Sequence, residues 1–175
     1  VPNNCNGGVF FKPLRWGVDS LYLSYPGRLN EDVQAELERL KGIAQSPQPH
    51  QQALAQYPVE GHIFEVKDKG SGLFPYILED NCFRIALSRN TARSLPMGYV
   101  KVSSDYLAHV PPHEAERRLR FVLESSGNLS AVASVSRIDL YVDFVCGFDM
   151  ESWDRHAWVT RAGQINSYAV DGNFS

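Results

Sequence analysis

Hydrophobic and polar residues alternate in several short segments of the chain, a pattern that predicts β-strands. In residues 18–25 (VDSLYLSY), the two leucines and Tyr25 fall on one side, and the two serines and Tyr22 fall on the other. The same alternation, or a short apolar run bounded by turn residues, predicts further strands over 62–68, 73–80, 82–89, 98–107 and 131–144. Asp80 and Asn81 form the predicted tight turn between 73–80 and 82–89.

A period of 3.6 residues predicts two helices. The first covers 30–46, with Asn30 at its N-cap and acidic residues in its first turn. The second begins at the prolines of 109–127 and stops at Gly127. Residues 1–15 are expected to be a flexible arm, and 47–58 a loop or short helix.

The predicted order, β-α-β-β-β-β-α-β, indicates an α+β domain over residues 16–175. We expect an antiparallel sheet with both helices on one face, in a split-βαβ arrangement. Residues 18–25 and 137–144 are expected to be neighbouring inner strands.

Composition places the chain among ordinary globular proteins. It has 175 residues, of which 43% are hydrophobic and 21% charged, which disfavours disordered and collagen-like classes. No apolar run approaches the length of a membrane span, and we expect a cytoplasmic protein. Three cysteines without CxxC spacing indicate neither a disulfide framework nor a structural zinc site.

Charge is distributed unevenly along the chain. The formal net charge is −3, but the span from Arg84 to Arg137 holds eight basic and four acidic residues. This asymmetry is compatible with a basic patch for a polyanion.

The segment 136–144 (SRIDLYVDF) carries the strongest candidate chemistry. Its apolar face holds Ile138, Leu140, Val142 and Phe144, and its polar face holds Arg137, Asp139, Tyr141 and Asp143. The two carboxylates can form a solvated face with ion pairs, for example to Arg137, or act as a general acid and base. They can also bind a divalent metal. Four residues of extended strand separate them by about 13 Å, so each would need a partner from a neighbouring strand.

The chain resembles the Rep-trans family of replication initiation factors, encoded by rolling-circle plasmids, filamentous phages and integrative elements. The resemblance is carried by VDSLYLSY, SRIDLYVDF, and WVTRAGQINSY with the GNFS tail, and it covers most of residues 16–175. It implies a nicking domain similar to that of HUH endonucleases, with carboxylates as metal ligands in place of a His-hydrophobic-His pair. Consistently, the sequence contains no His-x-His.

The resemblance implies a function in DNA replication. A tyrosine would nick one DNA strand at an origin, form a 5′-phosphotyrosine and rejoin the strand, with Mg²⁺ or Mn²⁺ polarising the phosphate. Asp139 and Asp143 match the acidic strand of the family, and Asp19 is a candidate third metal ligand. The nucleophile motif is expected beyond Ser175, so that this chain would be the N-terminal part of a longer protein and inactive by itself. Neither Tyr141 nor Tyr168 lies in such a motif.

The predicted partner is single-stranded or hairpin origin DNA. Tyr141 is a candidate for stacking on a base, and the candidate phosphate contacts are Arg137, Arg84, Arg89, Lys101 and Arg161. A host helicase and a second copy of the chain are further candidate partners. The alternative function is a non-catalytic DNA-binding or interaction module of the same fold, in which the acids are structural. An unrelated α+β domain would bind neither metal nor DNA.

Overall fold

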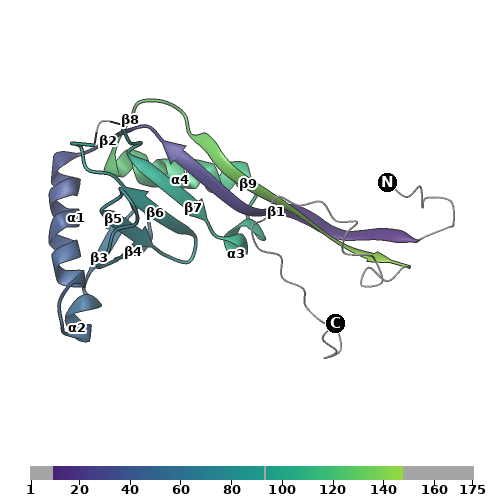
Figure 1. Ribbon diagram of the computed structural model, residues 1–175, viewed down its shortest axis with the longest axis horizontal. Coiled ribbons are helices and arrows are strands. Elements are labelled where there is room, and N and C mark those ends of the chain that lie inside the picture. The colour runs from purple at the N-terminus through teal and green to yellow at the C-terminus, as the bar shows by residue number, and fades with distance from the viewer. Residues whose placement is uncertain (1–9, 93, 148–175) are drawn as a thin grey trace. The chain divides into compact units, whose positions relative to one another are not determined.

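The structure is a computed structural model that describes residues 10–92 and 94–147 (Figure 1). The longer strands are β1 (Phe11–Tyr25), β4 (His62–Val66), β5 (Tyr76–Glu79), β6 (Phe83–Leu87), β7 (Gly98–Val102) and β9 (Ser134–Cys146). The shorter strands are β2 (Gly27–Leu29), β3 (Gln56–Val59) and β8 (Gly127–Leu129), and the helices are α1 (Glu31–Ala44), α2 (Pro49–Gln52), α3 (Ser104–Leu107) and α4 (Pro112–Ser126). Seven strands form one sheet in the order β3-β4-β5-β6-β7-β1-β9, and β2 pairs with β8.

The sheet is antiparallel from β3 to β1, which confirms the predicted α+β class. Residues 18–25 and 137–144 lie in neighbouring strands, as expected, because β9 follows β1 in the sheet. Only β1 is an inner strand, however, since β9 stands at the edge of the sheet among the described residues.

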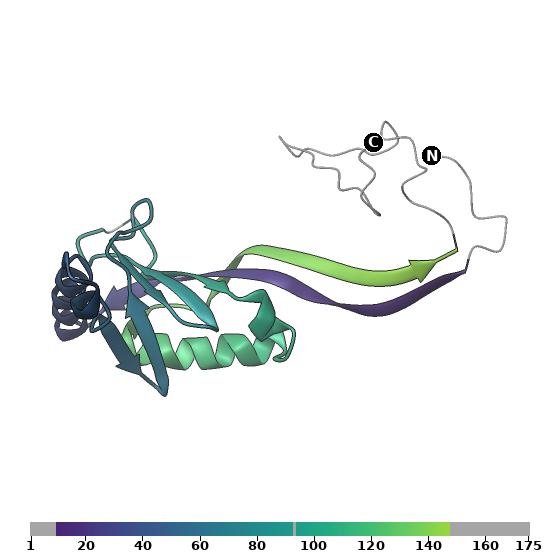
Figure 2. The same ribbon diagram turned by 90° about the horizontal axis from the view of Figure 1, so that it is seen from below.

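One face of the sheet forms the hydrophobic core. Leu21 pairs with Val102, which in turn pairs with Phe83, and all three side chains are buried on this face. The apolar sides of both long helices complete the same cluster, with Leu37 and Leu40 from α1, and Ala115, Leu119, Val122 and Leu123 from α4. Figure 2 shows α4 lying along this face. Both long helices therefore contribute to one hydrophobic core.

Local sequence explains where the helices begin and end. Asn30 is extended at the N-cap of α1, although its side chain makes no capping hydrogen bond, and Glu31 and Asp32 occupy the first turn. Pro112 opens α4, as its fixed φ allows. At Gly127 the chain passes directly from α4 into β8, where a Cβ atom would lie 2.4 Å from the carbonyl oxygen of Arg28.

Four details differ from the sequence prediction. β1 begins at Phe11, so residues 11–15 of the expected arm are strand. The predicted strand 98–107 ends at Val102, because the Ser103 hydroxyl accepts a hydrogen bond from the Tyr106 backbone N–H and starts α3. Residues 47–58 include the first three residues of the strand β3 as well as the short helix α2. The β2–β8 pair was not predicted.

The predicted burial of the apolar face of β9 is wrong for the described residues. Ile138, Leu140 and Val142 are 49%, 74% and 48% exposed. Tyr141 and Asp143 contact the part of β1 around Gly17 and Arg15, which precedes the buried half of that strand. This stretch of β9 therefore lies beside residues that have no core beneath them.

The chain divides into two compact units, Arg15–Asp143 and the two ends Val1–Leu14 and Phe144–Ser175. In the second unit, Gly147 N–H donates to the Phe10 carbonyl, and the rings of Phe11 and Phe144 lie 4.7 Å apart. None of the described helices combines the length and the apolar character needed to cross a membrane.

Candidate nucleic-acid interface

The face of the sheet opposite the helices, called here the open face, carries a row of polar side chains. The antiparallel register places Tyr22 of β1 beside Lys101 of β7, and Lys101 beside Arg84 of β6. The same register extends the row from Arg84 to Glu79 of β5 and then to Glu65 of β4. The row thus has a tyrosine and cations toward β1 and carboxylates toward β4.

Three half-buried aromatic rings lie in a row on the open face. The Tyr22 and Tyr99 ring centroids are 6.1 Å apart, and those of Tyr99 and Phe74 are 6.2 Å apart. Phe74 comes from the turn before β5, and Tyr99 precedes Lys101 by two residues on β7. Partly exposed aromatic rings at the surface of a sheet provide stacking platforms for nucleic-acid bases.

Two cations lie over one ring of this row, that of Tyr22. The Lys101 ammonium is 5.8 Å and the Arg137 guanidinium carbon 5.5 Å from the centre of the Tyr22 ring, which is cation–π geometry. Arg137 also forms a salt bridge of 2.6 Å with Asp139, whereas Lys101 forms none with the described residues. We call Tyr22, Tyr99, Phe74, Lys101 and Arg137 the open-face cluster.

The aspartates of β9 are both paired with arginines. Hydrogen bonding from the Arg137 guanidinium, assisted by the Ser20 hydroxyl, holds the pKa of Asp139 below its ordinary value. Asp143 is paired with Arg15. Asp19 is exposed and accepts a long hydrogen bond of 3.4 Å from Ser20.

Tyr141 lies between these ion pairs. Its ring packs on Gly17, where an added Cβ would be 3.0 Å from the ring, and the Arg15 guanidinium is 5.7 Å from the ring centre. The Tyr141 ring therefore packs against β1, and it is half-buried like the rings of the open-face cluster.

Asp139, Asp143 and Asp19 do not come together as a three-ligand group. Within the described ranges, the group of metal-ligating side chains that does so is His62, Asp80 and Cys82, at the other end of the sheet order. Carboxylate oxygens suit Mg²⁺ or Mn²⁺ by chemistry, but those of Asp139 and Asp143 are engaged by arginines. As arranged, these residues do not fit a divalent-metal site, and their metal role stays a prediction.

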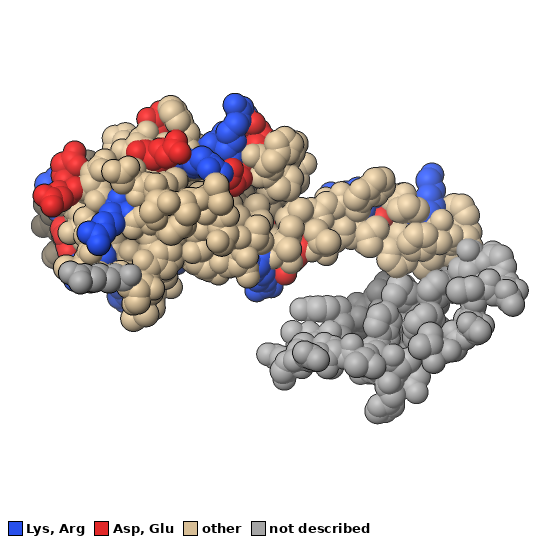
Figure 3. All heavy atoms as spheres, turned by 90° about the horizontal axis from the view of Figure 1, so that it is seen from above, with Lys and Arg blue, Asp and Glu red and all other residues tan. Residues whose placement is uncertain are grey.

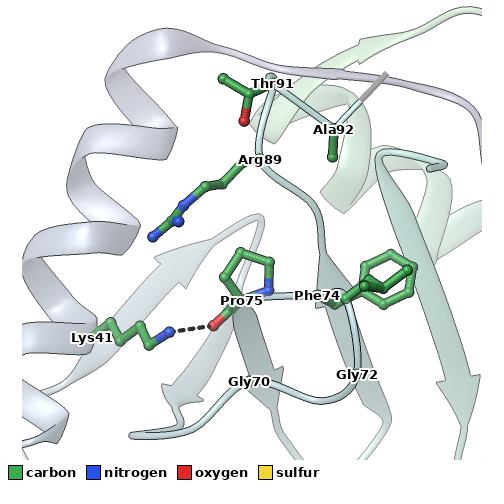
Figure 4. A pocket seen from close by; sticks show the side chains of 9 residues that line it. Lys41, Gly70, Gly72, Phe74, Pro75, Arg89, Thr91 and Ala92 are labelled. Atoms are coloured by element: carbon green, nitrogen blue, oxygen red, sulfur yellow. Dashed lines mark hydrogen bonds between the residues drawn. The ribbon is translucent and has the colours of Figure 1, made fainter. Parts of the chain in front are cut away.

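Arg89 contacts α1 and shares a pocket with one member of the open-face cluster, Phe74. Its guanidinium forms a salt bridge with Glu38 of α1 and approaches the Tyr76 ring to 6.0 Å. With Lys41, Pro75 and Phe74 it lines a pocket of about 400 Å³ (Figure 4). Lys41 donates a hydrogen bond of 2.9 Å to the Pro75 carbonyl at this pocket.

Acidic and basic side chains are interleaved on the surface. On the face drawn in Figure 3, blue and red side chains lie next to one another. On the open face, Arg84 pairs with Glu79 at 2.9 Å, and Lys67 pairs with both Glu65 and Glu79. Because most cations are neutralised locally, Lys101 carries a large share of the uncompensated positive charge on the open face.

The structure brings together part of the predicted set. Arg137, Lys101 and Arg84 share the open face, Arg89 does not, and Arg161 and Tyr168 lie outside the described residues. Tyr22, Tyr99 and Phe74 were not predicted as site residues. The alternation of β7 puts Tyr99 and Lys101 on one face, which is a sequence signal for Tyr99, but the contact of Phe74 depends on the fold of its loop.

Comparison of the chain with protein-family models, curated proteins and solved structures finds no match.

Proposed function

We propose that the open face binds single-stranded DNA through the open-face cluster. The observation that carries the proposal is the Tyr22 ring, which contacts Tyr99 within the sheet and has Lys101 and Arg137 over it. Bases would stack on the tyrosines, while the two cations contact the phosphates between them. Stacking is tolerant of sequence, so the cluster would bind single strands of varied sequence.

The resemblance to Rep-trans initiators extends this proposal. On that basis, the chain is the DNA-binding part of a cytoplasmic rolling-circle initiator, with a nicking domain similar to that of HUH endonucleases. Its own residues would hold the strand. The second candidate, a non-catalytic DNA-binding module, is favoured by one observation: Asp139 and Asp143 are paired with arginines.

Fluorescence anisotropy with a labelled single-stranded oligonucleotide tests the binding. We expect Tyr22→Leu, which keeps an apolar side chain but removes the ring, to weaken binding by about 5- to 150-fold, because base stacking contributes roughly 1–3 kcal/mol. Lys101→Ala should weaken binding and reduce the slope of log K against log salt by about 0.7 for each phosphate that the variant no longer neutralises.

Arg117→Ala is the matched control for Arg137→Ala. Both arginines are exposed and salt-bridged to an acid, but Arg117 belongs to α4, on the helix side of the sheet. Only Arg137→Ala should weaken DNA binding. An absence of binding at low salt, or equal losses of affinity in both variants, contradicts the proposal.

A nicking assay tests the second candidate, because nicking by this chain would exclude a non-catalytic module. We expect no nicking of supercoiled DNA by this chain, even with Mn²⁺. Metal-dependent nicking that disappears in Tyr99→Phe, Tyr141→Phe or Tyr168→Phe would place the nucleophile within these 175 residues.

A further inference from the structure

Three side chains with metal-ligating atoms meet at the start of β4 and the turn between β5 and β6. The ligand atoms of His62, Asp80 and Cys82 lie within 4.8 Å of one another. His62 Nδ1 is 2.6 Å from Asp80 Oδ2, and the two side chains are only 20% and 14% exposed. Cys82 is half-buried.

The fold fixes the orientation of each group. The His62 ring stacks on Phe64 at 5.4 Å and contacts Phe83 at 5.5 Å. Asp80 Oδ1 accepts hydrogen bonds from the backbone N–H groups of Cys82 and Phe83, at 2.8 and 2.7 Å, so Oδ2 is the oxygen directed at His62.

The turn itself is tied to the chain that follows β7. Ser103 N–H donates to the Cys82 carbonyl at 2.9 Å, and the Ser103 hydroxyl donates to the Asn81 carbonyl at 2.8 Å. In known metal sites, hydrogen bonds to the residues that carry the ligand atoms orient those atoms and reduce the free-energy cost of assembling the site.

We propose that His62, Asp80 and Cys82 bind Zn²⁺, with water as a fourth ligand. Imidazole nitrogen, carboxylate oxygen and thiolate sulfur form a mixed set that suits Zn²⁺ and disfavours Mg²⁺ and Ca²⁺, which prefer oxygen ligands. Bond lengths of about 2.0–2.3 Å require the ligand atoms to lie roughly 3.3–3.8 Å apart, so small side-chain rotations complete the site. The ion would replace the hydrogen bond between His62 and Asp80, and the Cys82 thiol would release its proton to solvent.

This site is separate from the open-face cluster. His62 follows the alternation of Phe64, whose side chain is buried under the helices, and therefore lies on the covered face of the sheet. Bound Zn²⁺ would join β4 to the β5–β6 turn and stabilise the folded chain, because a ligand that binds only the native state shifts the unfolding equilibrium.

Cobalt substitution tests the proposal on the reduced, metal-free protein. We expect Co²⁺ to give a thiolate-to-cobalt charge-transfer band that Zn²⁺ removes by displacement. The band should be lost in Cys82→Ser and kept in Cys146→Ser, which changes another half-buried cysteine. His62→Gln should weaken Co²⁺ binding at least tenfold.

Thermal unfolding provides a second readout. Zn²⁺ should raise the midpoint of the wild type and of Cys146→Ser by several degrees and leave Cys82→Ser unchanged. Asp80→Asn keeps the Oδ1 acceptor of the turn and should lose most of the Zn²⁺ effect. The proposal is overturned if the wild type gives no band, if the band persists in Cys82→Ser, or if Zn²⁺ leaves the wild-type midpoint unchanged.

Discussion

Glu114 shows how one half-buried carboxylate can make stability depend on pH. It accepts hydrogen bonds from Arg117 and Arg118 at 2.8–2.9 Å in the first turn of α4. These hydrogen bonds lower its pKa from 4.5 to about 2. A carboxyl group whose pKa is lower in the folded than in the unfolded state stabilises the fold above the unfolded pKa, and loses this effect as pH falls through the folded value.

We therefore expect Glu114→Gln to lower the thermal midpoint at pH 7 and to flatten its decline between pH 4.5 and pH 2. Circular dichroism melts across this pH range measure both effects. Glu124→Gln is the control, because Glu124 is exposed on the same helix and forms none of the salt bridges seen among the described residues. Identical pH profiles for the wild type and Glu114→Gln would contradict the role of this ion pair.

At the scale of the element, the passage from α4 to β8 depends on close backbone approach. A Cβ at Gly127 would lie 2.4 Å from the Arg28 carbonyl oxygen and 2.6 Å from the Met97 sulfur. Gly42, in α1, has nothing within 4 Å of its Cβ position. We therefore expect substitution by alanine to have opposite effects on stability at the two glycines.

Gly127→Ala should destabilise the protein by roughly 1–3 kcal/mol, the usual cost of overpacking, since the β2–β8 pair must separate. Gly42→Ala should stabilise it by about 0.5–1 kcal/mol, the difference in helix propensity. Urea unfolding of both variants measures these changes. Destabilisation by Gly42→Ala, or a neutral Gly127→Ala, would contradict this interpretation of the two glycines.

Elements with a clear period were predictable, and those fixed by distant contacts were not. β6 was predicted from the run of apolar residues after Asp80-Asn81, and α4 from its prolines and its stripe through Leu119. The three-residue strands β2 and β8 are too short for a period, and their pairing depends on Gly127. The exposure of Ile138 and Leu140 could not be inferred from the alternation, which shows two faces but not which of them is covered.

The same limit applies to the candidate sites. Lys101 and Arg137 were predicted as phosphate contacts because DNA binding needs cations on the face that carries the acids. Their meeting at Tyr22 depends on strand order, which brings β7 and β9 to the two sides of β1. His62 lies far from Asp80 and Cys82 in sequence and follows none of the usual metal-binding spacings, so spacing alone indicated no zinc site.

At the scale of the whole molecule, α1, α4 and the sheet of Arg15–Asp143 share one hydrophobic core. A single core predicts cooperative unfolding of this unit. Leu119 is fully buried on α4, whereas Phe121, two residues later on the same helix, is 58% exposed.

Leu119→Ala should destabilise the protein by about 2–5 kcal/mol, because it leaves a cavity in this core. Phe121→Ala should cost well under half as much, because its side chain is largely in solvent. Urea transitions followed by far-UV and near-UV circular dichroism measure the change and should coincide in both variants. Equal costs, or separate transitions for the two signals, would contradict a single core.

The position of β1 also determines the order in which a nascent chain can assemble. β1 leaves the ribosome before the other strands, yet its neighbours are β7 and β9, the fifth strand of the β3–β7 meander and the last strand described. The meander can form through hairpins during synthesis, because each strand pairs with the next. β1 must wait with its backbone hydrogen-bonding groups and Leu21, Leu23 and Tyr25 unprotected, so we expect chaperones to bind this segment during translation.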